Sequence, residues 1–130
     1  MAMKNLLAIA LDWATRSFGA AQMRNPGTRS LRVVEEAIEL AQSCNVPQST
    51  IELCVREVYS KPKGVVNQEV GGVLMTIYMF IAGVGHLYGG DDPEWYFVTE
   101  LRRVLAKPPK HFEDRNAAKI AAGLDVRRTT

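Results

Sequence analysis

The chain has 130 residues, 47% of them hydrophobic and 23% charged, with a net charge of +2. This length fits a single domain spanning residues 1–130, which can bury a core without disulfides. These fractions exclude a disordered, collagen-like or coiled-coil chain, and the small charge gives no argument for nucleic-acid binding. Cys44 and Cys54 show neither metal-site spacing nor a secreted disulfide pattern, so a cytoplasmic setting is expected.

Charge is distributed unevenly along the chain. Residues 1–100 carry 8 basic and 11 acidic residues, whereas residues 101–130 carry 8 basic and 3 acidic ones. The basic C-terminal segment, residues 107–130, could serve an anionic ligand. A solvated basic tail explains the same pattern, and charge alone favours that simpler interpretation.

Apolar residues recur at three- and four-residue spacings, which predicts helices and no strands. Helix boundaries are indicated by the turn at 25–27, a capping box at 49–52, an N-cap and proline at 92–93, and Gly123. The expected helices cover 3–23, from 28 or 30 to 43, 49–60, from 66 or 67 to the glycines at 83–90, from 93 to before Pro108, and 112–122. This order predicts an all-α bundle of four to five main helices.

One apolar stretch, Val70–Leu87, contains no Asp, Glu, Lys or Arg. Its 18 residues lie at the lower limit for a membrane-spanning helix. It contains four glycines and a histidine, and the rest of the chain offers no second span. We therefore expect a buried core helix and no membrane association.

Three carboxylates share one face of the second predicted helix. On a helical wheel Glu35, Glu36 and Glu39 fall within about 100° of one another, opposite an apolar face. Such clustered like charges repel, and the repulsion is offset either by Arg32 or by a divalent cation. A solvated acidic face is the simpler explanation for this pattern taken alone.

A further acid, Glu69, opens the apolar fourth helix, on a face of small and apolar residues. Its position is explained by the helix dipole, which favours an acid in the first turn. The alternative explanation is a metal site, because helix bundles build such sites from carboxylates on facing helices. In that case Glu69 would face Glu36 and Glu39.

With these acids in place the sequence resembles the MazG-like all-α NTP pyrophosphohydrolases, of the phage single-domain type. The family pattern is ExxE, a spacer, then ExxD. Here the first half is Glu36-Ala37-Ile38-Glu39 and the second is Glu69-Val70-Gly71-Gly72. The segment 115–119 (RNAAK) resembles the family's Asn/Lys phosphate-binding segment. The likeness covers residues 5–122, and the MazZ-like branch, which acts on purine nucleotides including (d)GTP, is the branch it suggests.

The resemblance implies a MazG-like fold that assembles as a homodimer or homotetramer. It also implies divalent-metal-dependent hydrolysis of a (d)NTP to the (d)NMP and pyrophosphate in the cytoplasm, of the host if the chain is phage-encoded. Two or more Mg²⁺ or Mn²⁺ ions would polarise the phosphates and activate water. Glu36, Glu39 and Glu69 are the expected metal ligands, and Glu35 either joins them or orients the attacking water, roles that Glu35 and Glu36 could exchange.

Basic and aromatic residues complete the expected site. The candidates for binding the phosphates are Lys110, Arg115, Asn116 and Lys119. Trp13 is the candidate wall for the base, although a Trp at this spacing is also typical of plain core.

One departure from the family pattern is Gly72, which stands where the family has its last ligand, Asp. Three explanations are open. The four glutamates Glu35, Glu36, Glu39 and Glu69 are enough to bind the metal ions, or Asp91 or Asp92 takes the place of the missing ligand, or the chain is catalytically weak. The alternative function is therefore a non-catalytic helical module that binds nucleotides or another partner.

Overall fold

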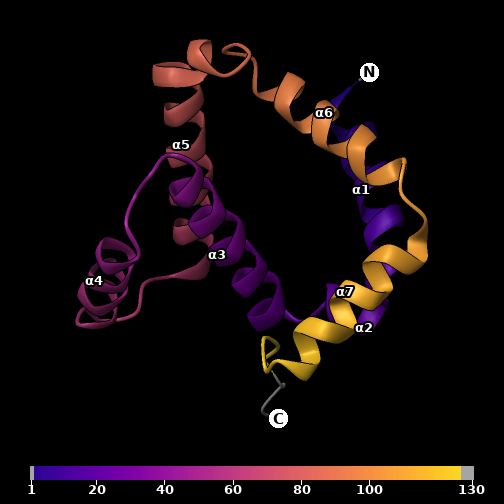
Figure 1. Cartoon of the computed structure of the whole chain (residues 1–130), viewed down its shortest axis with the longest axis horizontal. Helices are drawn as coiled ribbons and strands as arrows, with labels where there is room; N and C mark the ends of the chain where they lie inside the picture. Colours follow the sequence, from indigo (N-terminus) through magenta and orange to yellow (C-terminus); the bar gives the residue numbers. More distant parts are fainter. Residues whose placement is uncertain (1, 127–130) are drawn as a thin grey trace.

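Residues 2–126 are described by the computed structural model, and all regular structure in that range is helical (Figure 1). The all-α prediction is confirmed. The elements are α1 (Met3–Phe18), α2 (Ala20–Met23), α3 (Pro26–Ser43), α4 (Gln48–Tyr59), α5 (Val66–Val84), the 3₁₀ turn η1 (Gly85–Leu87), α6 (Pro93–Leu105) and α7 (Pro109–Ala121).

The first predicted helix is broken in two. Gly19 has φ +85°, a conformation that favours glycine, and it ends α1 before the short α2 begins. Asn25 then caps α3 by accepting a hydrogen bond from the Thr28 amide at 3.2 Å, with Pro26 at the first helical position. The turn predicted at residues 25–27 is thus the start of α3.

The capping box predicted at residues 49–52 does not form. The extended backbone of Pro47 starts α4 at Gln48, earlier than expected, and no side chain caps this helix. Glu52 instead accepts a hydrogen bond from Gln48 Nε2 at 2.9 Å. The predicted caps of the last two helices are correct: Asp92 Oδ1 accepts from the Glu94 amide at 3.0 Å, and Gly123 follows α7 with φ +80°.

The core is small and lies where α1, α6 and α7 meet. It consists of the buried side chains Leu6, Leu101, Val104 and Phe112, with Trp13 and other partly buried side chains packed against them. Figure 1 shows these helices along one side of the molecule, and α3, α4 and α5 along the other. The core therefore belongs to one half of the fold.

The other half, residues 33–84, is called the arm and comprises most of α3 with α4 and α5. Ile81 is the one buried residue of α5, and α4 has none. The expectation of a buried core helix at Val70–Leu87 is therefore wrong for the single chain, because no other helix of the same chain covers α5. The helical stretch Val66–Leu87 is also long and apolar enough to cross a membrane, judged by length and composition.

The arm is joined to α6 through a glycine-rich turn. The Tyr96 hydroxyl lies 3.0 Å from the carbonyl oxygen of Gly85 and 2.7 Å from that of Gly90. A Cβ atom at Gly85 would collide with the Gly90 carbonyl. Only glycine permits this close approach, which sets the direction in which α6 leaves the arm.

Candidate functional site

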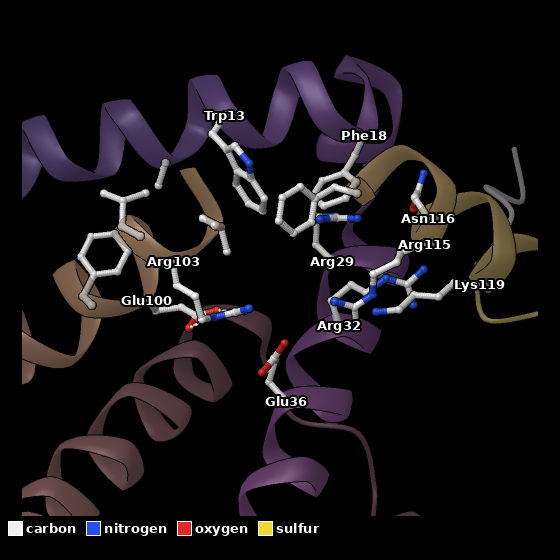
Figure 2. Close-up of a pocket in the computed structure, with 15 residues that line it drawn as sticks. Trp13, Phe18, Arg29, Arg32, Glu36, Glu100, Arg103, Arg115, Asn116 and Lys119 are labelled. Atoms are coloured by element: carbon white, nitrogen blue, oxygen red, sulfur yellow. Dashed lines mark hydrogen bonds and ion pairs between the residues drawn. The ribbon is translucent and has the colours of Figure 1, made fainter. Parts of the chain in front are cut away.

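A pocket of about 300 Å³ lies between α1, the first half of α3, α6 and α7 (Figure 2). We call it the arginine pocket. Its volume is at the lower end of the range for small-molecule sites. Its lining combines aromatic rings with cationic side chains, and both kinds come from helices far apart in the sequence.

The aromatic wall is built around Trp13, which points from α1 into the pocket. Its ring meets Phe112 edge-on at 4.9 Å between centroids and Phe18 at 5.5 Å. These contacts hold the indole in place, since edge-to-face pairs add to the stability that burial alone provides. A rigid flat ring at the pocket wall suits a ligand that has a flat ring of its own.

The cationic side chains that line the pocket outnumber its carboxylates. Five are cationic, namely Arg29, Arg32, Arg103, Arg115 and Lys119, while two are acidic, Glu36 and Glu100. Figure 2 shows Arg32, Arg115 and Lys119 gathered at one end, where α3 faces α7. Like charges held this close favour an anionic ligand between them.

Two of the guanidinium groups have buried N–H donors without a partner among the described residues. These donors are Arg29 Nε and Arg32 Nη2. Burial and the neighbouring charge of Arg32 lower the pKa of Arg29, which also lies over the Phe18 ring at 5.5 Å. A buried donor without an acceptor is costly, and a bound anion would remove that cost.

Glu36 lines the pocket on α3, one helical turn beyond Arg32. The hydrogen bond from Arg103 to Glu100 and the charge of Glu100 raise the pKa of Arg103, and the negative charge of Glu36 adds a smaller contribution in the same direction. The same hydrogen bond lowers the pKa of Glu100. The site is therefore polarised, with the carboxylates Glu36 and Glu100 towards α6 and the arm, and the cations Arg32, Arg115 and Lys119 towards α7.

Glu35 ties α7 to α3. Its two carboxylate oxygens accept hydrogen bonds from Arg32 Nη1 at 3.3 Å and from Lys119 Nζ at 2.9 Å, and all three side chains are largely buried. The predicted water-orienting or metal-binding residue thus makes two ion pairs in this structure. These pairs hold Arg32 and Lys119 at the edge of the pocket.

A second contact fixes the end of α7 on the start of α3. Thr28 is 1% exposed, and its hydroxyl accepts a hydrogen bond from the Val126 amide at 3.1 Å. Asn25 Nδ2 donates to the Val126 carbonyl at 2.6 Å. We call these contacts the C-terminal clasp, and they keep the cationic face of α7 against α3.

The predicted metal ligands are only partly brought together. Glu36 and Glu69 line a groove of about 890 Å³ between α3 and α5, called the α3–α5 groove. The Glu69 carboxylate lies beside Gly64, where a Cβ atom would collide with it. Glu39 is exposed and lines neither cavity.

Within residues 2–126, no group of three or more His, Cys, Asp or Glu side chains lies close enough to hold a metal ion. The expected magnesium or manganese site is therefore not assembled by the described part of one chain. The possible substitutes for the missing family Asp do not change this: Asp92 caps α6, and Asp91 is exposed and lines neither cavity.

Of the predicted substrate-binding residues, Trp13, Arg115, Asn116 and Lys119 all line the arginine pocket, whereas Lys110 does not. Lys110 is exposed and pairs with Asp114 at 3.2 Å. Sequence reasoning missed Arg29 and Arg103. Arg29 could have been predicted from the sequence, because its spacing of three from Arg32 places both residues on one helix face.

Comparison of this chain with protein-family models, with curated proteins and with solved structures finds no match. The class that fold and site define is therefore coarse: an all-α protein with a small core, an apolar arm and an aromatic, cation-rich pocket. The functional argument comes from the pocket itself.

Proposed function

We propose that this protein binds a nucleoside triphosphate in the arginine pocket and hydrolyses it to the monophosphate and pyrophosphate. The observation that carries the proposal is the pairing of the Trp13 ring with the unpartnered donors of Arg29 and Arg32 in one cavity. Such a cavity is complementary to a ligand that joins a flat base to a multiply charged anion. The resemblance to MazG-like enzymes supplies the reaction, and a purine substrate such as (d)GTP in the cytoplasm is part of the proposal.

The phosphates are assigned to the α3 and α7 end of the pocket. There Arg32, Arg115 and Lys119 offer several donors to oxygens that carry the charge. Arg29 adds a donor whose present lack of an acceptor favours binding. The Trp13 ring would contact the base, either stacked face to face or edge-on.

The divalent cation stays an expectation that comes from the resemblance alone. The carboxylates of the described residues form no group of three or more donors. They do not fit a resident metal ion in a single chain, and we derive no step of the reaction through one. In this proposal the pocket residues bind and orient the triphosphate, and Glu36 lies next to it.

The binding arm of the test reads Trp13 fluorescence in a Trp95→Phe background. Trp13 lines the pocket, whereas Trp95 packs against Gly89 and Tyr96 outside it. The ligands are the α,β-methylene analogue of GTP, inorganic triphosphate and guanosine. The analogue is expected to bind more tightly than either part and to change the fluorescence. No binding of the analogue would refute the proposal.

The chemical arm of the test compares Glu36→Gln with the matched control Glu113→Gln. Glu113 is exposed on α7 and lines neither cavity. Wild type and control are expected to release monophosphate and pyrophosphate. Glu36→Gln is expected to abolish turnover and, in a chelator, to bind the analogue more tightly because one repelling charge is gone.

The second candidate function is nucleotide binding without turnover. It is favoured by Gly72 in place of an acidic ligand and by the lack of a donor group for a metal among residues 2–126. Tight binding of the analogue with no product from any NTP or dNTP would establish it in place of the hydrolase.

A further inference from the structure

The three carboxylates on α3 do not share one environment. Glu36 and Glu39 are exposed. The Glu35 side chain is only 20% exposed, and its oxygens accept hydrogen bonds from Arg32 and Lys119. The acids that the family resemblance groups into one set of metal ligands therefore have different partners, and Glu35 is the one that contacts cations of the chain itself.

Glu35 brings together two cations from different helices. Arg32 precedes it by three residues on α3, whereas Lys119 lies 84 residues away on α7. The Arg32 and Lys119 side chains are 16% and 30% exposed, so solvent screens their mutual repulsion less than it would on an open surface. A carboxylate between them offsets that repulsion. Glu35 therefore allows a guanidinium and an ammonium group to lie side by side.

These two cations line the arginine pocket, but Glu35 lines neither cavity. Arg32 uses Nη1 for Glu35, and its Nη2 is buried without a partner among the described residues. The Lys119 ammonium has three donors, and its pair with Glu35 uses one. Both cations therefore keep donors for an anion in the pocket while Glu35 holds them from outside it.

We infer that Glu35 is a positioning residue for the phosphates, an assignment that rests on the proposed binding of a triphosphate in this pocket. It fixes the Arg32 guanidinium and the Lys119 ammonium where phosphate oxygens meet them. Long flexible side chains lose conformational freedom when they bind a ligand, and this loss weakens binding. Cations that are already fixed in the free protein avoid much of it.

The roles that the resemblance gives Glu35 fit its surroundings less well. A divalent cation bound to Glu35 would lie next to the charges of Arg32 and Lys119, which repel it. A residue that orients the attacking water must reach that water by a hydrogen bond. Glu36 lines the pocket and Glu35 does not. Glu35 therefore acts on the ligand through its two cations.

Glu35→Gln and Glu36→Gln form a matched pair, because they remove the same charge from adjacent residues of α3. Removing a negative charge near an anion site favours binding, and both variants share that effect. Only Glu35→Gln also releases Arg32 and Lys119. Loss of positioning and loss of repulsion thus change the affinity in opposite directions, and the comparison separates them.

The binding experiment measures the affinity for the α,β-methylene analogue of GTP in a chelator, by Trp13 fluorescence in the Trp95→Phe background. Glu35→Gln is expected to bind at least about threefold more weakly than wild type, whereas Glu36→Gln binds more tightly. Glu35→Asp keeps the charge but shortens the side chain, and it is also expected to weaken binding. A residue that only binds metal would have no effect in a chelator.

Two further variants separate positioning from the docking of α7. In a Lys119→Met background, Glu35→Gln is expected to lose most of its effect, because one of the two cations that it positions is absent. Thr28→Val loosens the C-terminal clasp without removing either ion pair. For the same lowering of the urea midpoint, Thr28→Val is expected to weaken binding less than Glu35→Gln does.

Turnover gives a readout that distinguishes positioning from water activation. Glu35→Gln is expected to raise KM, while kcat falls by less than the roughly 100-fold or more that loss of a general base costs. A 100-fold lower kcat with unchanged analogue affinity would identify Glu35 as the residue that orients water and would overturn the assignment.

Other results would also overturn it. One is binding of the analogue by Glu35→Gln and Glu35→Asp as tight as by wild type. Another is equal tightening in Glu35→Gln and Glu36→Gln, which would make Glu35 a repelling charge only. Both results leave the proposed function standing, because wild type still binds. Failure of wild type to bind the analogue would instead refute the proposed function, and the role of Glu35 with it.

Discussion

Replacing Arg29 by Met separates a ligand-binding role from a structural one. In the free protein Arg29 Nε has no partner among the described residues, and burial beside Arg32 lowers the pKa of Arg29. The charge is thus held in a place that disfavours it. Its interaction with the Phe18 ring returns about 0.5–1 kcal/mol. Removing the charge relieves the repulsion, and a Met side chain keeps an apolar contact with the ring.

The free energy of unfolding of Arg29→Met is therefore expected to stay within about 1 kcal/mol of wild type, because these effects offset one another. Binding of the triphosphate analogue should suffer far more. A hydrogen bond to a charged group contributes about 1.5–3 kcal/mol, which corresponds to a roughly 10- to 150-fold loss of affinity. The outcome to measure is weak binding by a normally stable protein.

The assay pairs urea unfolding, followed by circular dichroism, with Trp13 fluorescence titration in the Trp95→Phe background. Arg16→Met is the control, because Arg16 is exposed and pairs only locally with Asp12 at 2.7 Å. The control should bind like wild type. A variant that loses 2 kcal/mol or more of stability, yet binds the analogue as tightly as wild type, would show that Arg29 is structural and would refute the reasoning.

Three further predictions follow from individual contacts. Thr28→Val removes the hydroxyl that accepts the Val126 amide, so the C-terminal clasp should loosen at a cost of about 1 kcal/mol, with faster proteolysis after α7 as the readout; unchanged proteolysis would contradict it. Because the hydrogen bond from Arg103 lowers the pKa of Glu100, the pair stabilises the fold at neutral pH. This contribution is lost as the pH falls through that lowered pKa. In Glu100→Gln the free energy of unfolding should therefore fall less between neutral and acidic pH than in wild type, by less than about 1 kcal/mol because the pair is exposed. High salt should reduce this difference. Lys110→Met should leave analogue affinity unchanged, since Lys110 lies outside the pocket, and a tenfold loss would place the phosphates elsewhere.

Helix boundaries could be predicted from the sequence wherever a local signal decided them. Asp92 with Pro93 starts α6, and Gly123 follows the end of α7, because caps and left-handed glycines act within one turn. The capping box predicted at residues 49–52 does not form, because α4 begins earlier, at Gln48, directly after the extended backbone of Pro47. Gly19 was overlooked as a break inside an otherwise helical pattern.

The site could be predicted in part. Trp13, Arg115 and Lys119 were chosen from residue type and resemblance, and the structure brings them into one pocket. Arg103 was missed because its place beside Glu36 depends on how α6 packs, which no local spacing encodes. The burial of α5 was predicted wrongly for the single chain, because an apolar pattern indicates that a helix is covered without saying which molecule covers it.

The central claim is that the arginine pocket takes a nucleoside triphosphate for hydrolysis. The most direct test incubates the wild-type protein and the Arg115→Met variant with a panel of NTPs and dNTPs plus Mg²⁺, and separates the products by chromatography. The account predicts monophosphate and pyrophosphate from wild type, with a purine nucleotide preferred, and at least a tenfold lower kcat/KM for the variant. Equal turnover by both proteins, or no turnover and no binding of any nucleotide, would contradict it.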